Sequence, residues 1–218
     1  MFDKATSVAQ AAALIPDGAS VLVGGFMGVG SPHRLIDELV RQGRKHLTVI
    51  ANDTAMPGIG IGKLIAARAV DRLITTHIGL NPETQRQMIA GELAVELVPQ
   101  GTLAERIRSG GYGLGGVLTP TAVGTIAAEG KRTIDIDGRT FLLEMPITAD
   151  FALIGCQRAD YQGNLVYALT ARNFNPIMAM AGATVMAEAS EIVPVGEIPP
   201  DAVVTPHVLV DHLIEKAH

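Results

Sequence analysis

One stretch near the start of the chain limits its fold more than any other. Residues 17–32 run through a polar turn, an apolar run at 20–23, a glycine-dense loop and the pair Ser31-Pro32. Because glycine has no Cβ, the loop backbone can adopt positive φ and its N–H groups can approach a bound group. Ser31 is expected to cap a helix that begins at Pro32, with the positive helix end facing the same place. The stretch predicts a binding loop between a strand and a helix.

The spacing of the loop glycines argues against two common phosphate-binding loops. Counted from Gly25, the loop reads G-x-x-G-x-G, whereas the dinucleotide fingerprint requires G-x-G-x-x-G. Residues 58–63 end in lysine, but Leu64 stands where a P-loop needs a magnesium-binding hydroxyl. We therefore predict neither a Rossmann nucleotide site nor hydrolysis of nucleoside triphosphates.

Length and composition set further limits. The 218 residues fit a single domain over 1–218, and no linker or repeat divides them. The net charge is −5 and the basic residues are scattered, so we expect no nucleic-acid partner. The lone Cys156 cannot form an internal disulfide, and no apolar leader or membrane-spanning run is found, so a cytoplasmic protein without membrane contact is expected. With 48% hydrophobic and 18% charged residues, the composition favours an apolar surface that a partner covers.

The order of apolar runs and helix-like segments predicts the fold class. Their alternation is typical of an α/β fold, an open and mostly parallel sheet with helices on both faces. Helices are expected at 32–42 and from Asn81-Pro82 to Gly91. The pair Asp137-Gly138 within 134–142 predicts a small antiparallel hairpin inserted between the halves of the sheet. The expected strands are 20–23, 47–51, 72–77, 94–98, 151–155 and 184–187.

Ligands in open parallel sheets bind beyond the carboxyl ends of the strands, so the loops at those ends are the candidate site. They are residues 24–31, 52–54, 77–79 and 99–102. Gln100 and Asn52 carry amides that can donate to a carboxylate or thioester oxygen and do not ionise near neutral pH. The alternative roles are solvent exposure for Gln100 and turn capping for Asn52.

A second glycine-rich segment and the reactive side chains complete the candidates. Residues 110–116 contain five glycines and predict a lid, a segment laid against a ligand or another chain, or a flexible connector. No pair of histidines has metal-ligand spacing, so no metal is predicted, and His77 is interpreted as structural. Cys156 follows an apolar run and is expected to be a buried structural thiol. Ser31 lacks the G-x-S-x-G context of an esterase nucleophile.

Several motifs, taken in order along the chain, resemble those of the family I coenzyme A transferases. The likeness is to the alpha subunits of bacterial two-subunit members and to the N-terminal half of the fused members. It covers nearly the whole chain. The motifs lie at residues 17–32, 91–93, 98–108, 118–121 and 170–175.

The resemblance implies a function and a partner. The family exchanges CoA between an acyl-CoA and a free short-chain acid in a ping-pong reaction, through an enzyme-bound glutamyl-CoA thioester. CoA is then a substrate, and no permanently bound cofactor is expected. The nucleophilic glutamate belongs to the beta subunit in this family, so this chain is expected to supply no catalytic nucleophile and to pair in an alpha2beta2 heterotetramer. By the same resemblance, the CoA contacts are Gly24, Gly25, Phe26, Met27, Gly28, Val29 and Gly30, and the substrate or oxyanion pocket is lined by Asn52, Asp53, Gln100 and Gly101.

The substrate and two other functions stay open at this point. The fused transferases have Asn-Asn where this chain has Asn52-Asp53, so a second anionic group of succinyl-CoA would face Asp53. Acetyl-CoA or another monocarboxylic acyl-CoA is the expected donor, with acetoacetate or a short fatty acid as the other substrate. The alternatives are a sugar-phosphate isomerase or ligand-sensing relative, which would work alone, and a non-catalytic CoA-ester-binding or scaffold subunit.

Overall fold

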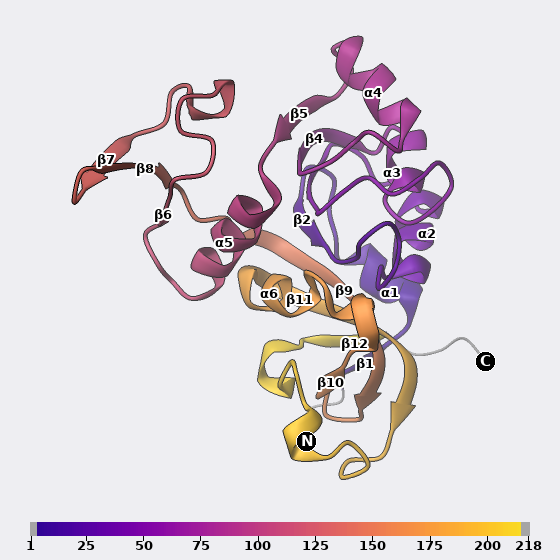
Figure 1. Cartoon of the computed structure of the whole chain (residues 1–218). Helices are drawn as coiled ribbons and strands as arrows, with labels where there is room; N and C mark the ends of the chain where they lie inside the picture. The colour runs from indigo at the N-terminus through magenta and orange to yellow at the C-terminus, as the bar shows by residue number, and fades with distance from the viewer. Residues whose placement is uncertain (1–3, 215–218) are drawn as a thin grey trace.

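The computed structural model describes residues 4–214, which form a layered α/β fold (Figure 1). In this part of the chain, nine strands form the main sheet: eight follow the order β1-β12-β11-β9-β2-β3-β4-β5, and β10 pairs with β9. Neighbouring strands run parallel except β10, which is antiparallel to β9. The predicted open, mostly parallel sheet is confirmed. Its strands are β1 (Ala5–Thr6), β2 (Ser20–Val23), β3 (Leu47–Ile50), β4 (Val70–Thr75), β5 (Ala94–Leu97), β9 (Ala149–Asp160), β10 (Leu165–Val166), β11 (Gly182–Val193) and β12 (His212–Ile214).

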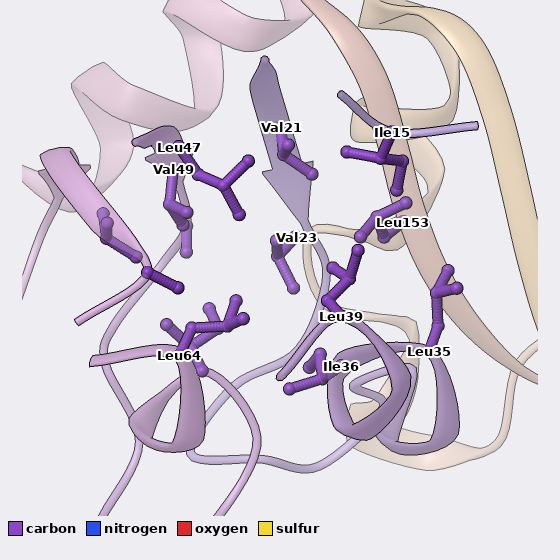
Figure 2. Close-up of a cluster of buried hydrophobic side chains, with 14 of the residues drawn as sticks. Ile15, Val21, Val23, Leu35, Ile36, Leu39, Leu47, Val49, Leu64 and Leu153 are labelled. Atoms are coloured by element: carbon purple, nitrogen blue, oxygen red, sulfur yellow. The ribbon is translucent and has the colours of Figure 1, made fainter. Parts of the chain in front are cut away.

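Helices cover both faces of the main sheet, as predicted. Successive side chains of a strand point to opposite faces, so Val21 and Val23 of β2 enter one buried cluster and Leu22 enters the other. The first cluster includes side chains of α1, α2 and α3, with Leu39 of α2 beside Val23 (Figure 2). The second includes side chains of α5 and α6. The helices are α1 (Val8–Ala13), α2 (His33–Arg41), α3 (Gly62–Ala66), α4 (Pro82–Ile89), α5 (Gln100–Gly111) and α6 (Asn175–Ala181), with short 3₁₀ turns η1 (Ile126–Ala128), η2 (Leu169–Arg172), η3 (Pro200–Ala202) and η4 (His207–Leu209).

Helix α2 is held by its apolar face. Leu35, Ile36 and Leu39 fall on one side of the helix and are fully buried. Burying each of these side chains contributes about 2 kcal/mol. The helix ends ahead of Gly43, whose φ of +71° places it in the left-handed region that glycine adopts without strain. The predicted helix and its glycine stop are confirmed.

Strands β9 and β11 extend well beyond the predicted 151–155 and 184–187. They pair with each other from Ala149 and Gly182 to Asp160 and Val193. The extensions carry charged residues, so a strand prediction based on stretches of apolar residues stops before them. In the sheet, however, Glu191 lies opposite Arg158, and a carboxylate oxygen is 3.0 Å from a guanidinium nitrogen. Opposite charges on neighbouring strands therefore continue the ladder where apolar residues end.

A small antiparallel sheet projects from the main body (Figure 1). It contains the predicted hairpin, in which Asp137 and Gly138 have φ of +49° and +76°, as a two-residue type I′ turn requires. A third strand, which was not predicted, pairs with the hairpin. Near its base, the buried Glu144 carboxylate accepts a hydrogen bond of 2.6 Å from the Lys131 ammonium. Its strands are β6 (Val117–Thr119), β7 (Thr133–Ile136) and β8 (Arg139–Glu144).

The glycine-rich segment 110–116 divides into two parts. Gly110 and Gly111 belong to the last turn of α5. A Cβ on Gly110 would lie 2.0 Å from the Ile147 carbonyl oxygen, and a Cβ on Gly111 would lie 2.7 Å from Cβ of Met180. These two glycines let α5 pack closely on its neighbours. The remaining residues connect α5 to β6.

Candidate active site

The glycine loop (residues 24–30) is a miniature hairpin at the carboxyl end of β2. Phe26 and Val29 exchange both backbone hydrogen bonds, at 3.0 and 2.9 Å. Met27 and Gly28 between them have φ of +52° and +86°, the signature of a type I′ turn. The side chains of Phe26 and Val29 remain 44% and 49% exposed. The loop therefore has one defined shape and presents two apolar side chains at its tip.

Two of the loop glycines are required by close neighbours. A Cβ on Gly24 would lie 1.7 Å from Oδ1 of Asn175. Gly25 has φ of +121°, and a Cβ there would lie 2.0 Å from Oγ of Ser31. No side chain can be added at either position without moving these neighbours.

Most N–H groups of the loop are already used inside the protein. Gly28 and Gly30 are the exceptions in residues 24–31, because their amides donate to no other group of residues 4–214. The binding loop predicted from the sequence thus retains two donors rather than a full set. The amides already engaged are those of Gly24, Gly25, Phe26, Met27, Val29 and Ser31.

The N-terminus of α2 differs from the prediction. Ser31 is not the N-cap: the cap position is Pro32, and no side chain of the cap residue bonds to the helix. Instead the Glu188 carboxylate of β11 accepts the N–H groups of Arg34 at 3.2 Å and Leu35 at 2.9 Å. A carboxylate is the stronger acceptor for the positive end of a helix. The Arg34 and Leu35 amides at that end are therefore bonded to Glu188 and are not free for a ligand.

Three of the four pocket residues predicted from the sequence, Asn52, Asp53 and Gln100, meet in one hydrogen-bonded chain, here called the amide chain. Nε2 of Gln100 donates to Oδ1 of Asn52 at 2.6 Å, and Nδ2 of Asn52 donates to Oδ2 of Asp53 at 2.6 Å. The same oxygen of Asp53 accepts the Met27 N–H at 2.9 Å, and Oδ1 accepts the Ala55 N–H at 2.7 Å. The amide chain connects the start of α5 to the tip of the glycine loop.

The three polar members of the amide chain differ in what they offer a ligand. Asn52 and Asp53 are 2% and 6% exposed, and their polar atoms are engaged with one another and with the backbone. Gln100 is exposed and keeps one N–H and its carbonyl oxygen. The expectation that a second anionic group of a donor would face Asp53 is not supported, because this carboxylate is turned toward the glycine loop. Of the three, Gln100 is the one whose polar atoms are accessible from outside.

One cavity lies beside the start of α5 and another lies beside the end of the glycine loop. One of about 540 Å³ begins at Gly101 and runs along α5 past Ala104 to Leu118 of β6. The other, of about 650 Å³, lies beside Gly30 and is also lined by Cys156. Burial, and secondarily the Glu188 carboxylate, raises the pKa of Cys156 to about 12. This agrees with the structural thiol that the sequence predicts.

Two further features of the described residues bear on the site. In residues 4–214, no group of three or more His, Cys, Asp and Glu side chains is placed to hold a metal ion. The helices of the same range include none that is long and apolar enough to cross a membrane. His77, the one histidine predicted at this edge, forms an isolated parallel bridge with Asp53 through its backbone.

Two asparagines that touch the loop were missed. Asn173 and Asn175 lie in the motif at 170–175, to which sequence reasoning assigned no role, and both bond to the backbone of residues 24–30. Their signal in the sequence is faint. Two amides spaced around Phe174 immediately before a proline indicate a helix start, and nothing local points to a loop that lies far away in the chain.

The fold and the site together define an α/β protein that presents neutral donors at the carboxyl edge of a parallel sheet. The family model described as Coenzyme A transferase matches residues 5–216, and the chain belongs to this family. Membership decides against the sugar-phosphate isomerase alternative.

Curated relatives match over nearly their full length. The chain is 52% identical to the acetate CoA-transferase subunit alpha of Escherichia coli K12, over 98% of this chain and 97% of that one. It is 48% identical to the acetoacetyl-CoA:acetate/butyrate CoA transferase alpha subunit of Clostridium acetobutylicum, over 92% of each chain.

Solved structures of lower identity share the fold. Glutaconate coenzyme A-transferase of Acidaminococcus fermentans superposes with a TM-score of 0.83 at 19% identity, over 97% of this chain and 75% of that one. An acyl-CoA transferase of Escherichia coli O157:H7, in a thioester complex with CoA, superposes with a TM-score of 0.88 at 21% identity. The match covers 98% of this chain and 47% of that enzyme, so the chain spans about half its length.

Proposed function

We propose that this chain is the alpha subunit of a cytoplasmic CoA-transferase that moves CoA between a short-chain acyl-CoA, such as acetyl-CoA, and a free acid, such as acetoacetate or a short fatty acid. A glutamate of the beta subunit is the nucleophile. It takes CoA as a thioester while the first acid leaves as a free carboxylate, and the second acid then takes the CoA and restores the glutamate. The complex is an alpha2beta2 heterotetramer, and CoA is a substrate, with no permanently bound cofactor.

The amide chain is the observation that carries this proposal. Thioester exchange builds negative charge on the carbonyl oxygen, and a fixed donor at such an oxygen lowers the barrier by about 3 kcal/mol. Gln100 offers an N–H, and its other N–H is fixed on Asn52. The Gly28 and Gly30 amides are the further donors that we assign to the CoA side of the same cleft. Gly101 and the cavity along α5 are assigned to the acid.

The glutamates of this chain support a nucleophile from elsewhere. Five of them lie within 4 Å of a basic side chain, in ion pairs that serve the fold. A nucleophile needs a carboxylate free to reach the substrate. The relatives are named as alpha subunits, and the chain of the Escherichia coli O157:H7 acyl-CoA transferase is about twice as long as this one. The five glutamates are Glu83, Glu92, Glu96, Glu105 and Glu144.

Apolar side chains exposed near the glycine loop support a partner at this edge. Phe26 and Val29 stand at the loop tip, and Leu169 of η2 is 95% exposed. Such exposed apolar groups are costly unless another surface covers them. We assign this edge to the beta subunit.

The test is to purify the chain together with its beta subunit and to add acyl-CoA without an acceptor acid. Mass spectrometry of both polypeptides should find CoA on a glutamate of the partner and none on this chain. CoA on Cys156 or on a glutamate of this chain would overturn the assignment of roles. Transfer by the purified chain alone, at the rate of the complex, would overturn the need for a partner.

A further inference from the structure

A second set of contacts to the glycine loop comes from Asn173, which follows η2. Its Oδ1 accepts the Gly25 N–H at 3.2 Å, and its Nδ2 donates to the Val29 carbonyl oxygen at 3.0 Å. Gly25 and Val29 belong to the two arms of the miniature hairpin. One side chain therefore bonds to the loop before its turn and after it.

Asn175, the first residue of α6, bonds to three different segments. Its Nδ2 donates to the carbonyl oxygens of Gly30 at 3.1 Å and Ala171 at 2.8 Å, and its Oδ1 accepts the Gly155 N–H at 3.2 Å. The side chain is fully buried. Each polar atom is thus engaged, and the end of the glycine loop is tied at once to η2 and to β9.

The chemistry at Asn175 requires an amide. A carboxylate there would lose both donated bonds and place negative charge against the carbonyl oxygens of Gly30 and Ala171. The packing is equally restrictive, because Oδ1 of Asn175 occupies the space that a Cβ on Gly24 would need. The loop cannot shift toward α6 while Asn175 is in place.

We propose that Asn173 and Asn175, here called the asparagine latch, are positioning residues for CoA transfer. They fix the direction in which the Gly28 and Gly30 N–H groups point, while Asp53 holds the same loop through Met27. This inference rests on the proposed function. Contacts that hold CoA speed the reaction only when they place its thioester in the geometry of attack, and a misplacement of about 1 Å can cost about 10²-fold in rate. Loosening the latch should therefore reduce the turnover rate more than the affinity for the free acid.

The experiment uses the complex of this chain with its beta subunit and compares Asn173→Asp and Asn175→Ala with the wild type. We expect kcat to fall about 10²-fold for Asn175→Ala, as for other displacements of catalytic groups by about 1 Å. The KM for the free acid should stay unchanged, because Gln100 is untouched. Hydrogen exchange at residues 24–30 should become faster. Asn173→Asp keeps the acceptor for the Gly25 N–H and loses the donor to the Val29 carbonyl oxygen. Its kcat should therefore fall less than that of Asn175→Ala, again with an unchanged KM for the free acid.

The matched control is Asn164→Ala. Asn164 also uses both ends of its amide, donating to Asp160 at 2.7 Å and accepting the His207 N–H at 3.0 Å, but it does not touch the glycine loop. It should keep the wild-type kcat and the wild-type exchange at residues 24–30. If Asn164→Ala loses as much kcat as the latch variants, the effect is general destabilisation and the latch is refuted.

The remaining outcomes separate the two proposals. An active wild-type complex whose latch variants keep the wild-type kcat contradicts the latch alone. A wild-type complex that moves no CoA contradicts the proposed function itself. If Asn175→Ala fails to fold, the kinetics of Asn173→Asp test the latch instead. The side chain at position 173 is only partly buried, and the aspartate would retain the bond to the Gly25 N–H.

Discussion

The side-chain nitrogen of Gln100 lies 2.6 Å from Oδ1 of Asn52, although 48 residues separate the two in the chain. This contact places a residue of α5 against the end of β3, and through Asp53 it continues to the glycine loop. It also settles the orientation of the Asn52 amide, because Nδ2 must face the Asp53 carboxylate. One N–H of Gln100 is therefore fixed by the fold, and the other remains available to the ligand that we propose.

Gln100→Ala tests the donor directly. The variant removes the free N–H and the bond to Asn52, so we expect kcat/KM for the free acid to fall by roughly 10²-fold, the cost of one fixed donor to a developing oxyanion. Steady-state kinetics of the complete complex measure it. Gln42→Ala is the control, because this amide bonds to the Ala9 carbonyl and to Glu38. Unchanged kinetics of Gln100→Ala would exclude Gln100 from the site.

Asp53→Asn tests whether this carboxylate chooses the donor. Asparagine has one acceptor oxygen where Asp53 accepts three N–H groups, so we expect a loss of stability of about 1–3 kcal/mol. The ratio of rates with succinyl-CoA and acetyl-CoA should not change, because the side chain is buried. Thermal melts and donor kinetics check both statements. If the rate ratio of Asp53→Asn shifts toward succinyl-CoA, Asp53 faces the donor directly in the wild type.

Gly101→Ala should separate stability from activity. Nothing lies within 4 Å of a Cβ at this position, and the residue is in the first turn of α5. Replacing glycine by alanine in a helix should stabilise the chain by about 0.5–1 kcal/mol. The new methyl group borders the cavity that we assign to the acid, so the KM for the acid should rise. A more stable variant with unchanged KM would place the acid elsewhere.

Gly24→Ala, unlike Gly101→Ala, is expected to destabilise the chain. The added Cβ would meet Oδ1 of Asn175 at 1.7 Å, so the loop or the asparagine must move. Overpacking of this kind costs about 1–3 kcal/mol. We expect a lower unfolding midpoint in urea together with lost activity. A variant as stable as the wild type would show that the contact between loop and α6 can relax.

The stability of the folded chain at acid pH depends in part on Glu38. Hydrogen bonds from Arg41 and then Gln42 lower the pKa of Glu38 from its ordinary 4.5 to about 2. Because the unfolded chain takes up the proton first, the stabilisation is complete above about pH 4.5 and is lost as the pH falls toward about 2. Glu38→Gln should therefore show a shallower fall of the urea midpoint over this range. Glu129→Gln, at an exposed site, should keep the wild-type slope.

Cys156 should resist alkylation in the folded protein. Its pKa near 12 keeps the thiol protonated at neutral pH, and the side chain is 6% exposed. Only the thiolate reacts quickly with iodoacetamide. Mass spectrometry should find no label at pH 8 on the native chain and full label in denaturant. Rapid labelling of the native chain would refute the structural role.

The sequence by itself determined the parts of this protein that depend on neighbouring residues. The apolar run Val21-Leu22-Val23 predicts a strand of the helix-covered sheet, and Asp137-Gly138 predicts the turn of the inserted hairpin. Both patterns act through backbone conformation and burial within a few residues, and both are confirmed. The motifs by themselves also indicate the family.

Only the tertiary structure decided which groups of the site remain free. Ser31 has the chemistry of an N-cap, yet Glu188 occupies that helix end because the sheet order places β11 one strand away from β2, with β9 between them. Asn173 bonds to Gly25 across 148 residues of chain. Hydrogen bonds of this kind depend on strand order and on the distance between loops, which no local pattern contains. For that reason the glycine loop could be predicted from the sequence, whereas the two loop amides that bond to nothing within residues 4–214 could not.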